Sequence, residues 1–115
     1  MAVDMAKKVG IKHFVYHSVL HPQTQEMPHH WNKLLVEEMV LASGIPFTIL
    51  QPTAYMQNLL PQWADIQVNG VFRMPYPAGS AISLVDLEDV AIAAGRVLES
   101  ENSHGATLEL SLIHI

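Results

Sequence analysis

The sequence predicts an α/β fold in which helices flank a parallel sheet. Helix-compatible and strand-like stretches alternate along the first half of the chain, with short connections between them. Such alternation is typical of parallel strands that are joined by crossover helices. The strand-like stretches are also rich in aromatic and β-branched residues, as expected of buried strands.

The first helix is predicted at residues 2–9, because two lysines occupy its last turn and Gly10 follows as a stop. The stretch "HFVYHSVL" at 13–20 predicts the first strand. Residues 21–28 are polar and contain two prolines, which indicates a loop.

A second helix is predicted at residues 29–43, where apolar residues recur at helical spacing and Gly44 follows as a stop. Its apolar stripe consists of Leu35, Val36, Met39 and Val40. The stretch "IPFTILQP" at 45–52 predicts a short buried strand that Pro52 ends.

The second half of the chain is less regular. Residues 53–66 suggest an irregular helix that a proline interrupts, and residues 70–75 a short strand before a turn-rich loop. The clearest helix lies within residues 83–100, where Asp86 is placed to cap it. Residues 105–111 predict a last strand.

Composition narrows the classes of function. The chain has 115 residues, enough for one small domain. Its net charge of −5 argues against a nucleic-acid binder, and no apolar run is long enough to span a membrane. Without cysteines it has no disulfide framework or thiolate metal site, and we expect no metal site at all. A cytoplasmic protein is the default expectation.

Three blocks, "KHFVYHSV", "NKLLVEEMVLASGIPFTILQPTAYMQN" and "VDLEDVAIAA", resemble the NmrA-like family of atypical short-chain dehydrogenases. The resemblance implies a doubly wound, Rossmann-like sheet that binds NADP or NAD. No glycine-rich phosphate loop occurs in this chain, so residues 1–111 are expected to be the second half of such a domain, with the amino-terminal half missing. Residues 112–115 resemble a translated sequencing adapter and are expected to be a non-native tail, the alternative being an apolar strand.

Lys33 opens the second helix, where the helix dipole does not favour a cation. At about 100° per residue, Lys33 lies on the flank of the apolar stripe, so its stem can follow the sheet while its ammonium reaches a cleft. His29 shares this flank, whereas His30 is expected to point away. By resemblance, Lys33 matches the family's active-site lysine, which contacts the nicotinamide ribose. The alternative is a solvated surface lysine.

His29 occupies the position, four residues before the lysine, where classical short-chain dehydrogenases place a proton-donating tyrosine. A histidine could transfer a proton there near neutral pH, or it could bond a backbone carbonyl at the end of the loop. Both interpretations stay open.

Ser18 ends the first strand, and Pro52, Thr53 and Tyr55 follow the second. Ligands bind at this carboxyl edge in open parallel sheets. The resemblance implies that Ser18 hydrogen-bonds the substrate and that the loop with Pro52, Thr53 and Tyr55 contacts the nicotinamide. Tyr55 and Asn58 would then line the substrate pocket. Alternatively, Ser18 caps a loop, Pro52 ends a strand and Tyr55 packs in the core.

Two functions follow from the resemblance. One is an NADPH-dependent reductase of a small carbonyl or quinone-like compound, and the apolar stretch "YMQNLL" favours it. The other is a non-catalytic redox sensor that binds the dinucleotide and a regulatory protein partner, which the missing tyrosine favours. A structural α/β interaction module without a cofactor is a third alternative.

Overall fold

A three-stranded parallel sheet forms the centre of the computed structural model, which describes residues 2–23, 26–74 and 77–112. Its strands are β1 (Phe14–His17), β2 (Phe47–Pro52) and β5 (Ala106–Leu110), and β2 lies between the other two. The predicted parallel sheet is therefore confirmed. All three carboxyl ends lie at the same edge, because the strands are parallel.

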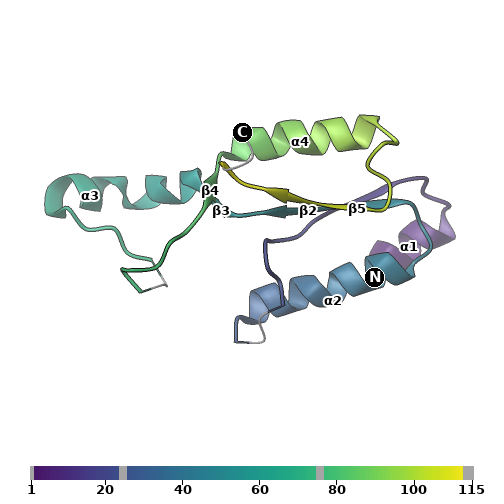
Figure 1. Cartoon of the computed structure of the whole chain (residues 1–115), viewed down its shortest axis with the longest axis horizontal. Coiled ribbons are helices and arrows are strands. Elements are labelled where there is room, and N and C mark those ends of the chain that lie inside the picture. Colours follow the sequence, from purple (N-terminus) through teal and green to yellow (C-terminus); the bar gives the residue numbers. More distant parts are fainter. Residues whose placement is uncertain (1, 24–25, 75–76, 113–115) are drawn as a thin grey trace.

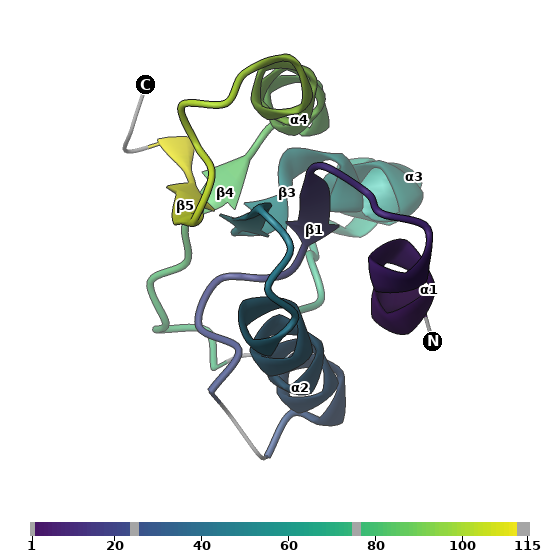
Figure 2. The same cartoon turned by 90° about the vertical axis from the view of Figure 1, so that its right-hand side faces the viewer.

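Helices cover both faces of this sheet (Figures 1 and 2). The helices α1 (Ala2–Lys8) and α2 (Pro28–Ala42) lie on one face, and α4 (Leu87–Glu99) lies on the other. This arrangement confirms the Rossmann-like α/β class. No helix within the part of the chain that the structure describes is both long and apolar enough to cross a bilayer.

The ends of the helices follow local sequence signals. Helix α2 begins at a proline, which suits the first helical turn, and is followed by Gly44 in a left-handed conformation with φ 76°. At the start of α4 the Asp86 carboxylate accepts a hydrogen bond from the Glu88 backbone N–H, at 2.8 Å. The predicted cap is thus confirmed.

The core lies against the central strand. Ile49 packs with Val3 of α1 and Val40 of α2, and both Ile49 and Val40 are 1% exposed. Leu50 is also 1% exposed and points to the α4 face, since side chains alternate along a strand. Burial of apolar side chains on both faces of β2 therefore holds the helices to the sheet.

The segment after β2 differs from the prediction. Two-residue strands β3 (Ala54–Tyr55) and β4 (Leu84–Val85) pair in parallel, and a 3₁₀ helix η1 (Met56–Gln62) precedes α3 (Trp63–Asn69). Figure 1 shows η1 and α3 extending beyond the carboxyl edge of the sheet. The interruption expected near Pro61 thus takes the form of a 3₁₀ segment containing that proline.

The strand predicted at 70–75 is wrong over residues 70–74, which form no regular structure; residue 75 lies outside the described residues. The physical reason is that the side-chain amide of Gln62 pairs with the backbone of Arg73. Gln62 Nε2 donates to the Arg73 carbonyl and Gln62 Oε1 accepts from the Arg73 N–H, both at 2.8 Å. These bonds satisfy backbone groups that a neighbouring strand would otherwise pair. Of the predicted tail at 112–115, residues 113–115 also lie outside the described residues.

Replacement of Thr48 by valine is expected to lower the free energy of unfolding by about 1–3 kcal/mol. Thr48 is fully buried, and its Oγ1 donates to the Ser103 carbonyl at 2.9 Å and lies 2.8 Å from His13 Nε2. Valine keeps the shape but leaves these partners unsatisfied. Urea denaturation of the complete gene product, meaning this chain with any further segment that its gene encodes, measures the change. The exposed Thr107 on β5 provides the matched Thr→Val control. Equal stability losses in both variants would contradict the prediction.

Candidate active site

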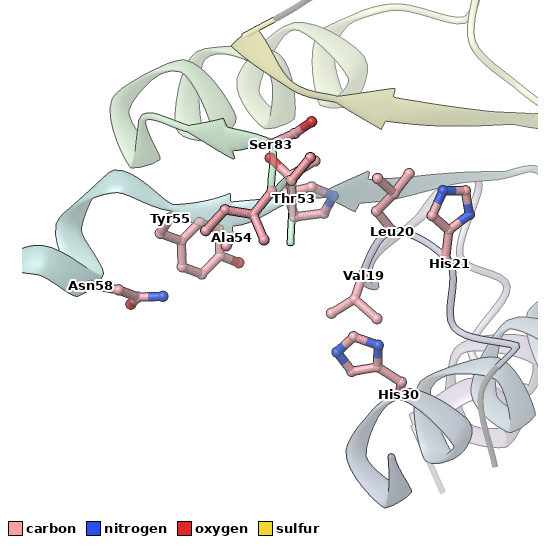
Figure 3. Close-up of a pocket in the computed structure, with 12 residues that line it drawn as sticks. Val19, Leu20, His21, His30, Thr53, Ala54, Tyr55, Asn58 and Ser83 are labelled. Atoms are coloured by element: carbon pink, nitrogen blue, oxygen red, sulfur yellow. The ribbon is translucent and has the colours of Figure 1, made fainter. Parts of the chain in front are cut away.

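A cavity of about 560 Å³ opens at the carboxyl edge of the sheet. Residues 19–21 after β1, residues 52–55 from the last residue of β2 through β3, and residues 81–83 before β4 line it, together with His30 and Asn58. Figure 3 shows Tyr55 and Asn58 on one side of this space and Val19 and His30 on the other. Segments that are distant in the sequence therefore meet where parallel sheets of this class bind ligands.

The ammonium of Lys33 lies at the tip of β1. Its Nζ donates to the carbonyl of His17, the last residue of that strand, at 3.0 Å. The same Nζ lies 5.2 Å from the centre of the Tyr16 ring, an arrangement in which ring and cation attract each other. The ammonium is thus held against the sheet, as its position on the helix flank predicts, and two of its three N–H groups stay available to another acceptor.

His17 and Tyr55 form a hydrogen-bonded pair beside this lysine. The Tyr55 hydroxyl lies 2.8 Å from His17 Nε2. Desolvation, and then the nearby Lys33 ammonium, lowers the pKa of His17, while desolvation raises the pKa of Tyr55. Both side chains are therefore neutral at pH 7. Sequence reasoning assigned His17 no role, although its place at a strand tip next to Ser18 is a usable signal.

Two buried hydroxyls at the same edge have no hydrogen-bond partner among the described residues, those of Ser18 and Thr53. Ser18 is 1% exposed, and its backbone N–H donates to the Leu50 carbonyl at 2.7 Å. Buried polar atoms in proteins are nearly always paired. Together with the free donors of Lys33, the unpaired hydroxyls fit the ribose and amide groups of a nicotinamide cofactor.

The two histidines at the start of α2 are placed differently from the expectation. His30 lines the cavity, whereas His29 is exposed and is not among the lining residues. The expectation that His30 points away was wrong, because the loop after β1 passes the first turn of α2 and places Val19 beside His30 at the cavity (Figure 3). Proton transfer by His29 remains a prediction.

A second cavity, of about 180 Å³, adjoins the first. Tyr55 and Asn58 line both cavities, and the second is bounded mainly by apolar side chains, among them Leu59, Phe72, Met74, Ile82 and Leu84. Pro52 is buried and lines the first cavity. The structure therefore brings Lys33, Ser18, Pro52, Thr53, Tyr55 and Asn58 to one edge of the sheet. Sequence reasoning missed residues 81–83, which reach this edge through the β3–β4 pairing.

Comparison with known proteins identifies the family. The sequence model of the NmrA-like family matches residues 2–113 of this chain. The chain belongs to the NmrA-like family. Two curated relatives of this NmrA-like chain carry the names of enzymes. The NAD(P)H azoreductase of Xenophilus azovorans is 34% identical over 98 residues, which cover 84% of this chain and 34% of that protein. Quinone oxidoreductase 2 of Escherichia coli is 30% identical over 109 residues, 95% of this chain and 38% of that protein.

Solved structures extend the similarity to the fold of this NmrA-like chain. The crystal structure of the Escherichia coli NADPH-dependent quinone oxidoreductase in complex with NADPH matches with a TM-score of 0.83 at 31% identity. The match covers 95% of this chain and 38% of that chain. The NmrA-like chain thus spans little more than a third of the length of these relatives.

Proposed function

We propose that the protein is an NADPH-dependent reductase of a small carbonyl or quinone-like compound. The observation that carries this proposal is the ammonium of Lys33, which is held at the tip of β1 by its bond to the His17 carbonyl, 3.0 Å away. It lies at the edge where the cavity opens and where two buried hydroxyls have no partner among the described residues. The azoreductase and quinone oxidoreductase relatives support the same class of reaction.

Each side chain has a proposed role. Lys33 binds the ribose of the cofactor, while Pro52 and Thr53 contact its nicotinamide. Ser18 orients the substrate, and Tyr55 and Asn58 enclose it, because both line the two adjoining cavities. The cofactor supplies a hydride when bound. NADPH rather than NADH is proposed because the structure of a relative was solved with NADPH. A cytoplasmic location is proposed as well, and the absence of cysteines is consistent with a reducing compartment.

A redox sensor that signals to a regulatory protein partner is the second candidate. It is favoured by His29, which stands where classical short-chain dehydrogenases carry their proton-donating tyrosine. A sensor would bind the same cofactor through Lys33 but would not consume it. Turnover is therefore the property that separates the two candidates.

Titration of the complete gene product with NADPH, followed by the fluorescence of the nucleotide, tests both. The reductase is expected to bind NADPH and to oxidise it with at least one compound from a panel of menadione, 1,4-benzoquinone and 4-nitrobenzaldehyde. Binding without consumption across this panel would support the sensor. Absence of NADPH binding would contradict both candidates and leave a structural interaction module.

A further inference from the structure

A hydride-accepting carbonyl or quinone oxygen must also take up a proton, so the proposed reductase needs a proton donor in its cavity. His29 lies outside the lining residues. His21 and His30 line the cavity, but among the described residues no side chain hydrogen-bonds and orients either ring. Tyr55 lines both cavities and has an ordered partner, His17.

We propose that Tyr55 is the catalytic proton donor of this site and that His17 restores its proton from solvent. This inference rests on the proposed reductase function. The proton-donating tyrosine would then come from β3, which lies across the cavity from the start of α2. In classical short-chain dehydrogenases it would occupy position 29 instead.

The geometry supports a relay of two groups. The Tyr55 hydroxyl lies 2.8 Å from His17 Nε2, and the two rings meet edge-on at 65°. His17 itself is exposed, so its other ring nitrogen can exchange protons with water. Lys33 fixes the backbone of His17 by donating to its carbonyl. Tyr55 thus faces the cavity while its partner faces solvent.

The step balances in protons and electrons. The substrate carbon accepts a hydride, with its two electrons, from the reduced nicotinamide, which is thereby oxidised. The electrons of the carbonyl π bond move to the substrate oxygen, which takes the Tyr55 proton as that O–H bond breaks. His17 Nδ1 takes a proton from water as Nε2 passes its own proton to the phenolate oxygen, so no imidazolate forms. His17 is then neutral with its proton on Nδ1, and exchange with water returns the ring to the Nε2–H form before the next turnover. One solvent proton is consumed for each hydride.

The protonation states suit this order of events. Burial keeps Tyr55 protonated until negative charge develops on the substrate oxygen, since it raises the pKa of the phenol. The pKa of His17 is lowered, so its neutral ring carries a single proton. For the relay that proton must sit on Nε2, where it points to Tyr55.

Kinetics of the complete gene product test the donor, with NADPH and the panel compound that it reduces fastest. Tyr55→Phe is expected to lower kcat by about 100-fold or more while the Kd for NADPH stays unchanged. His17→Gln should also lower kcat, and the double variant should be no slower than Tyr55→Phe, because the two groups act as one unit. His104→Gln, a histidine paired with His13 near the amino ends of the strands, is the matched control and should keep the wild-type kcat.

A wild-type kcat in Tyr55→Phe would overturn the inference and leave the proposed reductase intact. A loss of NADPH binding in Tyr55→Phe would overturn it too, because Tyr55 would then act by holding the cofactor. Absence of turnover in the wild type would overturn both the reductase and the relay.

A spectroscopic measurement gives a readout without turnover. With ¹⁵N-labelled histidine and NADP⁺, the Nε2 of His17, assigned by comparison with His17→Gln, is expected to give the chemical shift of a protonated ring nitrogen. In Tyr55→Phe its proton should exchange with water faster, since its acceptor is lost. An unprotonated Nε2 would overturn the inference, because Tyr55 would then donate its proton to His17 instead of to the substrate.

Discussion

Replacement of Ile49 by alanine is expected to lower the free energy of unfolding by about 2–5 kcal/mol. Ile49 lies on the central strand, is 1% exposed and packs with Val3 and Val40. The substitution deletes methyl groups that are buried in the core, and it leaves a cavity that the flanking helices fill only in part. Since α2 carries Lys33, the loss also loosens the helix that positions the site.

Urea denaturation of the complete gene product measures this loss as a lower midpoint with an unchanged slope. Ile92→Ala is the matched control, because Ile92 lies on α4 and is 53% exposed. We expect the control to change stability far less, since its side chain is already largely in water. A loss below about 1 kcal/mol for Ile49→Ala would contradict the packing described for β2.

Replacement of Lys33 by alanine is expected to weaken NADPH binding by about 1–3 kcal/mol, or about 5- to 150-fold in Kd. The variant removes a charged hydrogen-bond donor at the tip of β1, while the His17 carbonyl that it contacts can bond water instead. Lys33 is only partly buried, so the effect on folding is expected to be small. Fluorescence titration gives the change in Kd.

Lys12→Ala provides the control for charge. Lys12 is exposed and precedes the amino end of β1, the end opposite to the cavity. Both variants remove one positive charge, so a long-range effect on the anionic cofactor would weaken binding in both. Equal Kd values for NADPH in Lys33→Ala and Lys12→Ala would show that Lys33 does not contact the cofactor.

The parts of the fold that depend on local sequence could be predicted. The apolar period of residues 29–43 gives α2 and the flank position of Lys33, and Asp86 gives the start of α4. Short strands could not be predicted in this way. The β3–β4 pairing joins residues about 30 apart, and the bonds of Gln62 to Arg73 replace a strand that the local pattern at 70–75 suggests.

The candidate site shows the same division. Helical and strand spacing place Lys33 and Ser18 at one edge of the sheet without knowledge of tertiary contacts. The His17–Tyr55 pair joins residues that are 38 positions apart. The pairing of β1 with β2, which β3 follows in the chain, brings the two segments together. The side of α2 on which a histidine lies changes from one residue to the next. Which of these sides faces the cavity depends on the path of the loop at residues 19–21, which helical spacing does not give.

Crystals of the complete gene product grown with NADP⁺ test most directly whether the carboxyl edge of the sheet holds the cofactor. We predict that the nicotinamide ribose lies within hydrogen-bond distance of Lys33 Nζ, with the nicotinamide against Pro52 and Thr53. A cofactor bound at the amino ends of the strands, or a Lys33 ammonium turned to solvent with no contact to it, would contradict the assignment of the site.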